Sequence, residues 1–399
     1  MRSRLLLVSA LVLALPALGC GGGNKGGAAA KAADKGLPPA NPLAVQRMVE
    51  GATAAKDPRM QTRAIALFRE AIAIDPNLWE ARFDLGVVLA SSGDLAHAEE
   101  QLGAASKIAP EREEVAVALA EVRRRRGSNK EAAVGLEDFV KANPGAVEAR
   151  TLLVTSLRDS GQHDKAIAQA REVLVRKPGD ATALAELALC HLGKGERDTA
   201  HLLVKQSLDV DAKNAIAHRV QGLVHLAGGD DAAAFQAFSK AAQEDPRDTT
   251  SRLNMGAVLL RAGAYAKAAE QYKSALAASP DESAAQIGLA AALRGESGGK
   301  DAKRIDEAKG YLDKVLEHEP HNLAALFNMG ILLAESMKKP ADAKPYFERF
   351  LDNAPGDHPA RAEAERQLSG GKAAAAMTPP APAPASPAKA PPAKPTGKK

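Results

Sequence analysis

Apolar residues recur at helical spacing between about residues 45 and 368, in paired stretches that short polar turns separate. This spacing places the apolar side chains on one face of an α-helix. The turns within the pairs carry Gly or Asp, as in Ser92-Gly93-Asp94. A Pro follows the second stretch of most pairs, at a point where a helix cannot continue. The pattern predicts an all-α chain built from helical hairpins.

Three sets of residues repeat along the chain with a period of 34. The first set is a Pro at the end of each pair, with Ala212 at the single position that lacks it. An Ala precedes each of these positions by twelve residues, and a mostly small residue follows each by ten. The three sets are Pro76, Pro110, Pro144, Pro178, Pro246 and Pro280; Ala64, Ala98, Ala132, Ala166, Ala200, Ala234 and Ala268; and Gly86, Ala120, Val154, Ala188, Gly222, Gly256 and Ala290. Small residues at fixed points allow the two helices of a hairpin to cross closely.

The period and the small-residue positions resemble those of the tetratricopeptide repeat (TPR), and residues 79–112 match that family throughout. The resemblance implies a right-handed superhelical solenoid whose concave side is lined by the first helix of each hairpin. Aromatic residues make up only 3% of the chain, so its core must consist mainly of small residues in closely packed helices. No hairpin can bury its apolar face alone, but stacked hairpins bury one continuous core.

About nine repeats are expected, the first of them degenerate, followed by a capping helix over residues 358–368. Pro320 follows Pro280 by 40 residues, which predicts a six-residue insertion at 295–304 in repeat eight. Pro355 follows Pro320 by 35 residues, so repeat nine carries one extra residue. The expected repeats are 45–78, 79–112, 113–146, 147–180, 181–214, 215–248, 249–282, 283–322 and 323–357.

Residues 1–19 are typical of an export signal, with a basic start and an apolar stretch that is too short to span a bilayer. The stretch ends in Ala17-Leu18-Gly19-Cys20, which resembles the lipobox of bacterial lipoproteins and implies a lipid on Cys20. The alternative is an ordinary secretory signal cut near Ala17. Gly21 follows the Cys, and the resemblance then implies the outer membrane, facing the periplasm. With only two Cys in the chain, no disulfide framework is expected.

Two segments outside the repeats lack the apolar residues that a core needs. Residues 20–44 are rich in Gly, Ala, Lys and Pro and are expected to form a disordered tether. Residues 369–399, with eight Pro, five Lys and no acid, are expected to form a disordered tail. The region between them has 43 basic and 48 acidic residues, a net charge of −5, so nucleic-acid binding is not expected. The basic tail is suited to the cell wall or anionic lipid, or serves solubility alone.

Candidate chemistry is sparse, and neither catalytic residues nor a cofactor or metal site is expected. The segment 295–299 fits the G-x-S-x-G pattern around Ser297, but that pattern acts on a strand-to-helix turn, and a loop in the insertion is the simpler interpretation. His318, Glu319 and His321 lack zinc-site spacing because Pro320 interrupts the helix. Cys190 is expected to be a buried, inert thiol.

If the TPR resemblance holds, fixed positions of each first helix line the concave groove. They carry acids in the early repeats, Glu80, Asp84, Glu114, Glu121 and Glu148. In later repeats they become apolar, with a few hydrogen-bond donors. The predicted partner-binding residues are Leu189, Leu192, Arg219, Val220, Leu223, Leu226, Leu253, Asn254, Leu260, Arg261, Phe327 and Asn328. Apolar residues on an open face indicate a docking site for a partner helix or peptide, unless the solenoid closes or the capping helix fills the groove.

The two Asn residues of that set match the family's consensus Asn, which in some members hydrogen-bonds a ligand backbone. The Lys, Asn and Arg set by which chaperone-binding members hold a C-terminal carboxylate is not present. The sequence therefore favours a membrane-anchored scaffold or pilotin-like protein that binds other proteins in a bacterial pilus, motility or secretion assembly. The alternative is an accessory protein that presents substrates to cell-wall or envelope enzymes.

Overall fold

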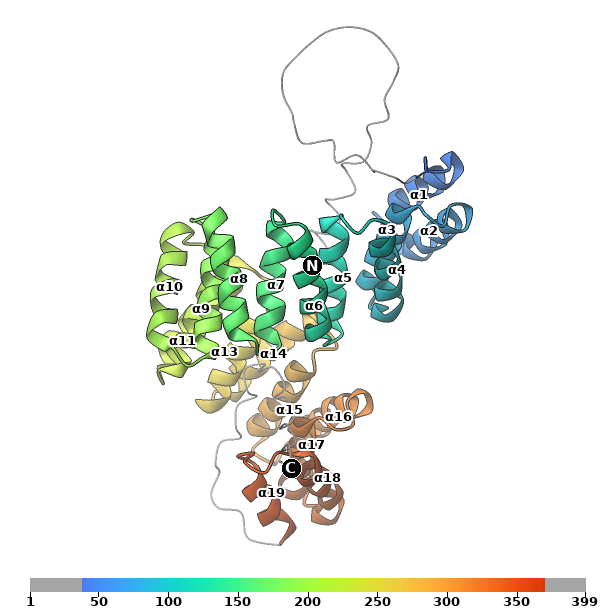
Figure 1. Cartoon of the computed structure of the whole chain (residues 1–399). Coiled ribbons are helices and arrows are strands. Elements are labelled where there is room, and N and C mark those ends of the chain that lie inside the picture. Colours follow the sequence, from blue (N-terminus) through green and yellow to red (C-terminus); the bar gives the residue numbers. More distant parts are fainter. Residues whose placement is uncertain (1–37, 370–399) are drawn as a thin grey trace, which may run out of the picture. The chain divides into compact units, whose positions relative to one another are not determined.

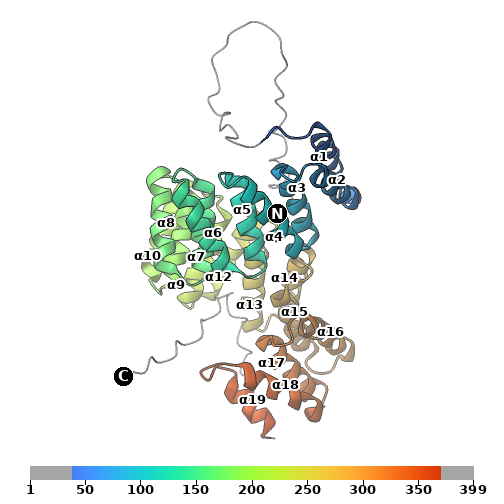
Figure 2. The ribbon, with the colours of Figure 1, turned by 45° about the vertical axis from the view of Figure 1, so that its right-hand side comes forward.

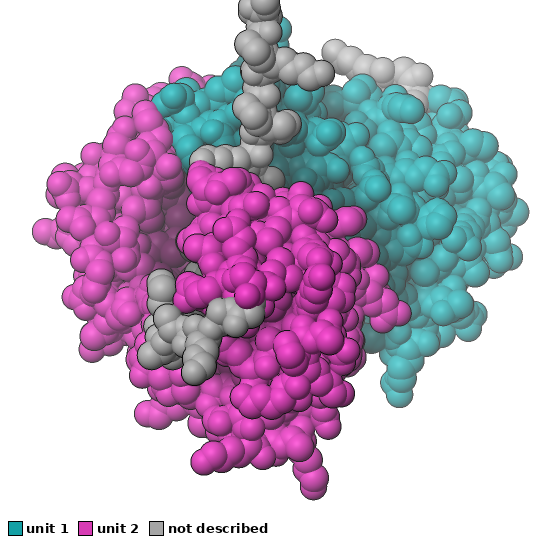
Figure 3. Space-filling model, turned by 90° about the horizontal axis from the view of Figure 1, so that it is seen from below, with its two compact units in different colours: residues 1–169 teal, residues 170–399 magenta. Residues whose placement is uncertain are grey.

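The computed structural model describes residues 38–369, and within that range every regular element is helical (Figures 1 and 2). Nineteen α-helices occur there, of which the first eighteen form nine hairpins and the last stands alone. The predicted all-α class and the number of hairpins are confirmed. The chain divides into two compact units at Gln169 and Ala170, coloured separately in Figure 3.

Unit 1 contains the first three hairpins, α1 with α2, α3 with α4, and α5 with α6, together with α7 and the start of α8. Successive helices from α1 to α7 pack against one another. The bounds are α1 Pro42–Ala54, η2 Pro58–Met60, α2 Gln61–Ile74, α3 Trp79–Ser92, α4 Leu95–Ile108, α5 Glu113–Arg125, α6 Asn129–Ala142, α7 Val147–Asp159 and α8 His163–Arg176.

Unit 2 continues with five hairpins and a final short helix. A π-helical turn, η3, follows α17. The bounds are α9 Ala181–Gly193, α10 Arg197–Val210, α11 Ala215–Ala227, α12 Asp231–Glu244, α13 Thr249–Arg261, α14 Tyr265–Ala278, α15 Ser283–Ser297, α16 Ala302–His318, α17 Leu323–Ile331, η3 Leu332–Ser336, α18 Pro340–Asn353 and α19 Arg361–Leu368.

The repeating small residues are the points of closest contact within the hairpins. All seven Ala of the second set, from Ala64 to Ala268, are fully buried. A Cβ atom at Gly222 would lie 2.5 Å from Cε1 of Phe238, and one at Gly256 would lie 2.6 Å from Cζ of Tyr272. Contacts this short exclude a side chain, so glycine on the first helix makes room for the aromatic ring on the second. The period of 34 therefore records a repeated packing contact.

Three local features differ in detail from the sequence expectation. The first helix begins at Pro42, inside the predicted tether, because Asn41 accepts a hydrogen bond from the N–H of Leu43 and Pro suits the first helical position. The insertion of repeat eight lengthens α15 and α16 to 15 and 17 residues and does not form a long loop. In repeat nine, the π-helical turn η3 continues the first helix after α17. A π-helical turn accommodates one extra residue within a helix, which matches the one-residue insertion in this repeat.

Several predictions fall on residues outside the described range. These are the signal peptide 1–19, the lipid on Cys20, most of the tether and the tail from residue 370 onward. Within residues 38–369, no helix combines the length and the hydropathy that a transmembrane span requires.

Candidate partner-binding faces

Four leucines of the predicted groove in unit 2 are partly exposed, and we call them the leucine face: Leu192, Leu223, Leu226 and Leu253. Leu192 and Leu223 pack against the cluster that α9 and α11 share. Leu223 and Leu226 also pack against a cluster that contains Met255 of α13. A surface hollow of about 640 Å³ adjoins this face and is lined by Leu192, residues 195–199 and Ala227. The face therefore offers apolar surface from three repeats.

Four other residues of the predicted groove are buried, so their expected exposure is wrong: Leu189, Val220, Leu260 and Phe327. Leu189 and Val220 lie in the seam between α9 and α11. Leu260 belongs to the main core cluster of the unit. Phe327 lies under α18, with its ring centroid 5.4 Å from that of Phe350. These side chains hold neighbouring helices together and are not available to a partner.

The polar residues of the predicted groove in unit 2 already have partners, either within their own repeat or in the preceding one. Arg219 donates from Nη1 to Oδ1 of Asp248 at 3.2 Å, and the Asp248 side chain is only 4% exposed. Arg261 forms an ion pair with Asp231. Asn254 donates from Nδ2 to the carbonyl of Thr250 at 3.0 Å. Asn328 makes the equivalent bond to Ala324 at 2.8 Å.

The corresponding face of unit 1 is charged. The carboxylates of Asp84, Glu114 and Glu148 have no hydrogen bond or ion pair among the described residues. Burial, and then the charge of Glu80, raise the pKa of the Asp84 carboxyl from 3.8 to about 7. A carboxyl group so perturbed and left without a cation is costly to keep ionised.

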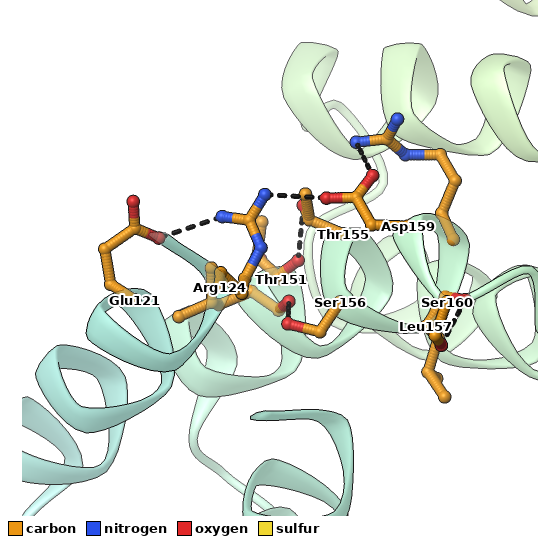
Figure 4. Close-up of polar contacts among 10 residues, drawn as sticks. Glu121, Arg124, Thr151, Thr155, Ser156, Leu157, Asp159 and Ser160 are labelled. Atoms are coloured by element: carbon orange, nitrogen blue, oxygen red, sulfur yellow. Dashed lines mark hydrogen bonds and ion pairs between the residues drawn. The ribbon is translucent and has the colours of Figure 1, made fainter. Parts of the chain in front are cut away.

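An arginine network lies further along the same first helices (Figure 4). Arg124 at the end of α5 donates to Oε2 of Glu121 and to Oδ2 of Asp159 on α7, each at 2.8 Å. Arg158 pairs with the same Asp159 at 3.2 Å. Of this network, the sequence pattern indicated only Glu121 and not Arg124 or Asp159. The period of 34 aligns Arg124 with Arg158, and Asp159 follows directly, so the repeat pattern places this acid near Arg124 at the ends of neighbouring first helices.

Sequence models of one repeat family match most of the described chain. Models described as tetratricopeptide repeat match residues 62–122, 117–181, 151–200, 185–249, 253–297 and 300–358. The chain belongs to the tetratricopeptide-repeat family. Members of this family are typically non-enzymatic scaffolds for protein–protein interaction, and no catalytic family matches. No curated protein matches the TPR chain in sequence.

The chain is similar to several solved structures at low sequence identity. YrrB, described as a TPR protein with an unusual peptide-binding site, is 21% identical, with a TM-score of 0.39 over 44% of this chain and 89% of its own. Yeast Tom70 is 12% identical, with a TM-score of 0.42 over 82% of this chain and 96% of its own. PilF of Pseudomonas aeruginosa is 20% identical, with a TM-score of 0.40 over 48% of this chain and 88% of its own.

The residues that the sequence offered for catalysis or metal binding lie at helix ends, in a turn or in the core of the TPR array. Ser297 ends α15, where its Oγ donates to the carbonyl of Arg294 at 2.8 Å and accepts from the N–H of Gly299 at 3.0 Å. His318 and His321 lie exposed around the turn between α16 and α17. The described residues contain no group of His, Cys, Asp or Glu that could hold a metal ion. Cys190 is buried in α9.

Proposed function

We propose that the TPR chain is a membrane-anchored scaffold that binds a partner protein through the leucine face of unit 2. The observation that carries this proposal is the partial exposure of four leucines from three successive repeats. At the equivalent positions, α7 of unit 1 carries Thr151, Thr155 and Arg158. Full burial of an exposed Leu side chain contributes about 1.5–3 kcal/mol, so each partly exposed leucine forfeits a fraction of that free energy. A partner that covers the leucine face recovers part of that free energy.

The two consensus asparagines support a partner that presents main-chain groups. The bonds from Nδ2 of Asn254 and of Asn328 to their own helices orient each amide, which leaves each Oδ1 as the acceptor for a ligand. An extended peptide or the first turn of a helix offers backbone N–H groups to such acceptors. Apolar side chains of the same partner segment would then cover the leucines.

A paired substitution tests the leucine face. We expect Leu223→Gln with Leu253→Gln to weaken partner binding by about 30-fold or more, because two apolar contacts are lost and amides are buried in their place. The matched control is Leu202→Gln, since Leu202 is 61% exposed on α10, a second helix. Titration against the captured partner, with circular dichroism as a check on folding, measures the effect. Unchanged affinity in the folded double variant would contradict the proposal.

The membrane anchor is a separate part of the proposal and rests on the sequence around Cys20. Two or more acyl chains hold a protein durably on a bilayer, since each buried CH₂ contributes about 0.8 kcal/mol. We expect Cys20→Ser to move the chain from the membrane fraction to the soluble periplasmic fraction, with the helical content unchanged. Cys190→Ser is the matched control. Retention of the Cys20→Ser variant on membranes would rule out the lipid anchor.

We further propose that the scaffold belongs to a pilus, motility or secretion assembly of the bacterial envelope, at the periplasmic side of the outer membrane. An exported, lipid-anchored array of interaction repeats suits the assembly of other envelope proteins. Crosslinking in the native cell followed by mass spectrometry tests this assignment. Recovery of assembly subunits supports it, whereas recovery of cell-wall synthases or hydrolases would favour an accessory role in cell-wall chemistry.

A further inference from the structure

The C-terminal helix α19 is held to repeat nine by few apolar contacts. The buried residues of this helix and of its entry turn are alanines, Ala360 and Ala364, and Leu368 adds a partly buried side chain. Such small side chains bury little apolar area, so they contribute little free energy to docking. The side chains that α19 helps to cover are larger and include Phe350 of α18, which is fully buried. The cap therefore depends strongly on its polar contacts.

Polar contacts fasten both ends of α19. At its start, Arg361 donates from Nη1 to the carbonyls of Leu351 and Ala354, at 2.8 and 2.9 Å, at the end of α18. At its finish, Gln367 donates from Nε2 to Oε1 of Glu335 in η3, at 3.2 Å. The charge of Arg361 is thus part of the fastening, and another cation beside it would weaken the cap.

His358 forms the third contact, in the turn that leads into α19. Its Nδ1 accepts a hydrogen bond from the N–H of Ala360 at 3.2 Å, and its ring packs edge-on to Phe350 with centroids 5.1 Å apart. Only the neutral imidazole can accept at Nδ1, because the imidazolium carries a proton on each nitrogen. Protonation of His358 therefore abolishes the bond to Ala360.

The groups around His358 oppose its protonation overall. Burial lowers the pKa of His358 from 6.5, and Arg361 lowers it further, while Asp357 acts in the opposite direction. From α18 the ring faces the uncharged Phe350, whose π system alone would favour a cation. Because the docked state holds the lower pKa, docking is strongest when His358 is neutral and weakens as the pH falls below 6.5.

We infer that α19 is a pH-sensitive cap, which is docked on repeat nine at neutral pH and loosens in mild acid as His358 is protonated. The change removes an acceptor from the entry turn and places a second cation beside Arg361. Loosening uncovers the apolar side chains around Phe350 at the C-terminal end of the array. This inference does not depend on the proposed partner or on the membrane anchor.

Hydrogen exchange of the full chain at pH 7.5 and pH 5.5, corrected for intrinsic exchange rates, tests the cap. We expect the protection of the α19 amides to fall by about three- to tenfold at pH 5.5, since the loss of one hydrogen bond of ordinary strength corresponds to about that factor. Amides of α13 to α15 are expected to keep their protection. Equal protection of α19 at both pH values, or a parallel loss across α13 to α15, would overturn the inference.

Two variants assign the effect to the imidazole. In His358→Asn, the side-chain oxygen can accept from the N–H of Ala360 at either pH, so the pH dependence of α19 protection should disappear. The matched control His321→Asn alters an exposed histidine in the turn between α16 and α17 and should keep the full pH dependence. Persistence of the pH dependence in His358→Asn would show that another group is responsible.

Discussion

Six central first helices, three in unit 1 and three in unit 2, stabilise their N-termini in two different ways. In unit 1, α3, α5 and α7 have no hydrogen bond from an N-cap side chain, but each carries Glu in its first turn. In unit 2, α9, α11 and α13 are capped by Asp180, Asn214 and Asp248, and none has an acid in the first turn. A cap satisfies an N–H group directly, whereas a first-turn acid interacts favourably with the helix dipole.

This difference decides the chemistry of the two faces. The second position of each first helix lies on the face, and in unit 1 it is Glu80, Glu114 and Glu148. Where a side-chain cap already stabilises the N-terminus, an acid at this position is not needed. In α9, α11 and α13 the second position is Thr182, Ile216 and Thr250. The acids of unit 1 therefore have a role in helix stability. At the N-terminal ends of these three helices, the leucine face of unit 2 is bordered by neutral residues, which suits an apolar partner.

Among substitutions that remove these N-terminal contacts, the largest loss of stability is expected at Asp248. Its Oδ1 accepts from the N–H of Ser251 and from Arg219, and its Oδ2 accepts from Oγ of Ser251 at 2.6 Å. Asp248→Ala removes the cap and leaves Arg219 without its buried partner. We expect α13 to lose about 3 kcal/mol of stability, measured by hydrogen exchange of its amides.

Asp180 provides the matched control. It caps α9 by accepting from the N–H of Ala183 at 2.9 Å, and it forms no ion pair within residues 38–369. We expect Asp180→Ala to cost about 1 kcal/mol. Equal losses in the two variants would mean that the pair with Arg219 adds nothing to the cap.

A smaller effect is expected in unit 1, where one helix caps the next. Glu113 of α5 accepts at Oε1 from the N–H of Ala149 in the first turn of α7, at 2.9 Å. We expect Glu113→Ala to destabilise the start of α7 by about 1 kcal/mol, as the loss of a cap does. Hydrogen exchange of the first amides of α7 measures the change.

The adjacent Glu114 separates this bond from the effect of charge alone. Glu114 lies in the same first turn and has no hydrogen bond or ion pair within residues 38–369. We expect Glu114→Gln to cost only about 0.3–0.5 kcal/mol, with the loss shrinking at high salt. A loss as large as that of Glu113→Ala would show that charge, and not the bond to Ala149, stabilises these helices.

The fold could be predicted from the sequence because the constraint behind it repeats. Each hairpin needs a small residue opposite a large one, as at Gly222 and Phe238. Because this contact recurs in successive hairpins, the small residues recur along the sequence with a clear period. The exposure of the face could not be predicted in the same way. Val220 and Leu223 both occupy face positions of α11, yet Val220 is buried against α9 and Leu223 is partly exposed. That outcome depends on how closely two first helices approach, which no single repeat encodes.

A stabilising effect is expected at Asp84, the perturbed carboxyl of unit 1. Because its pKa is raised to about 7 in the folded chain, the folded state favours the protonated form. The cost of ionising Asp84 is absent below its ordinary value of 3.8 and fully present above about pH 7. The stability of this region should therefore fall as the pH rises between these limits. We expect Asp84→Asn to stabilise α3 by about 1 kcal/mol at pH 8 and to have little effect at pH 4.

Glu80→Gln sharpens this last prediction, because the charge of Glu80 is the second cause of the raised pKa of Asp84. Removing that charge lowers the pKa of Asp84 and should reduce the pH dependence without abolishing it, since burial is the larger cause. Hydrogen exchange of α3 across pH 4 to 8, corrected for intrinsic rates, compares the three chains. If the wild type and Asp84→Asn respond to pH alike, the carboxyl is already solvated or neutralised, and the charged face of unit 1 carries no stored electrostatic cost.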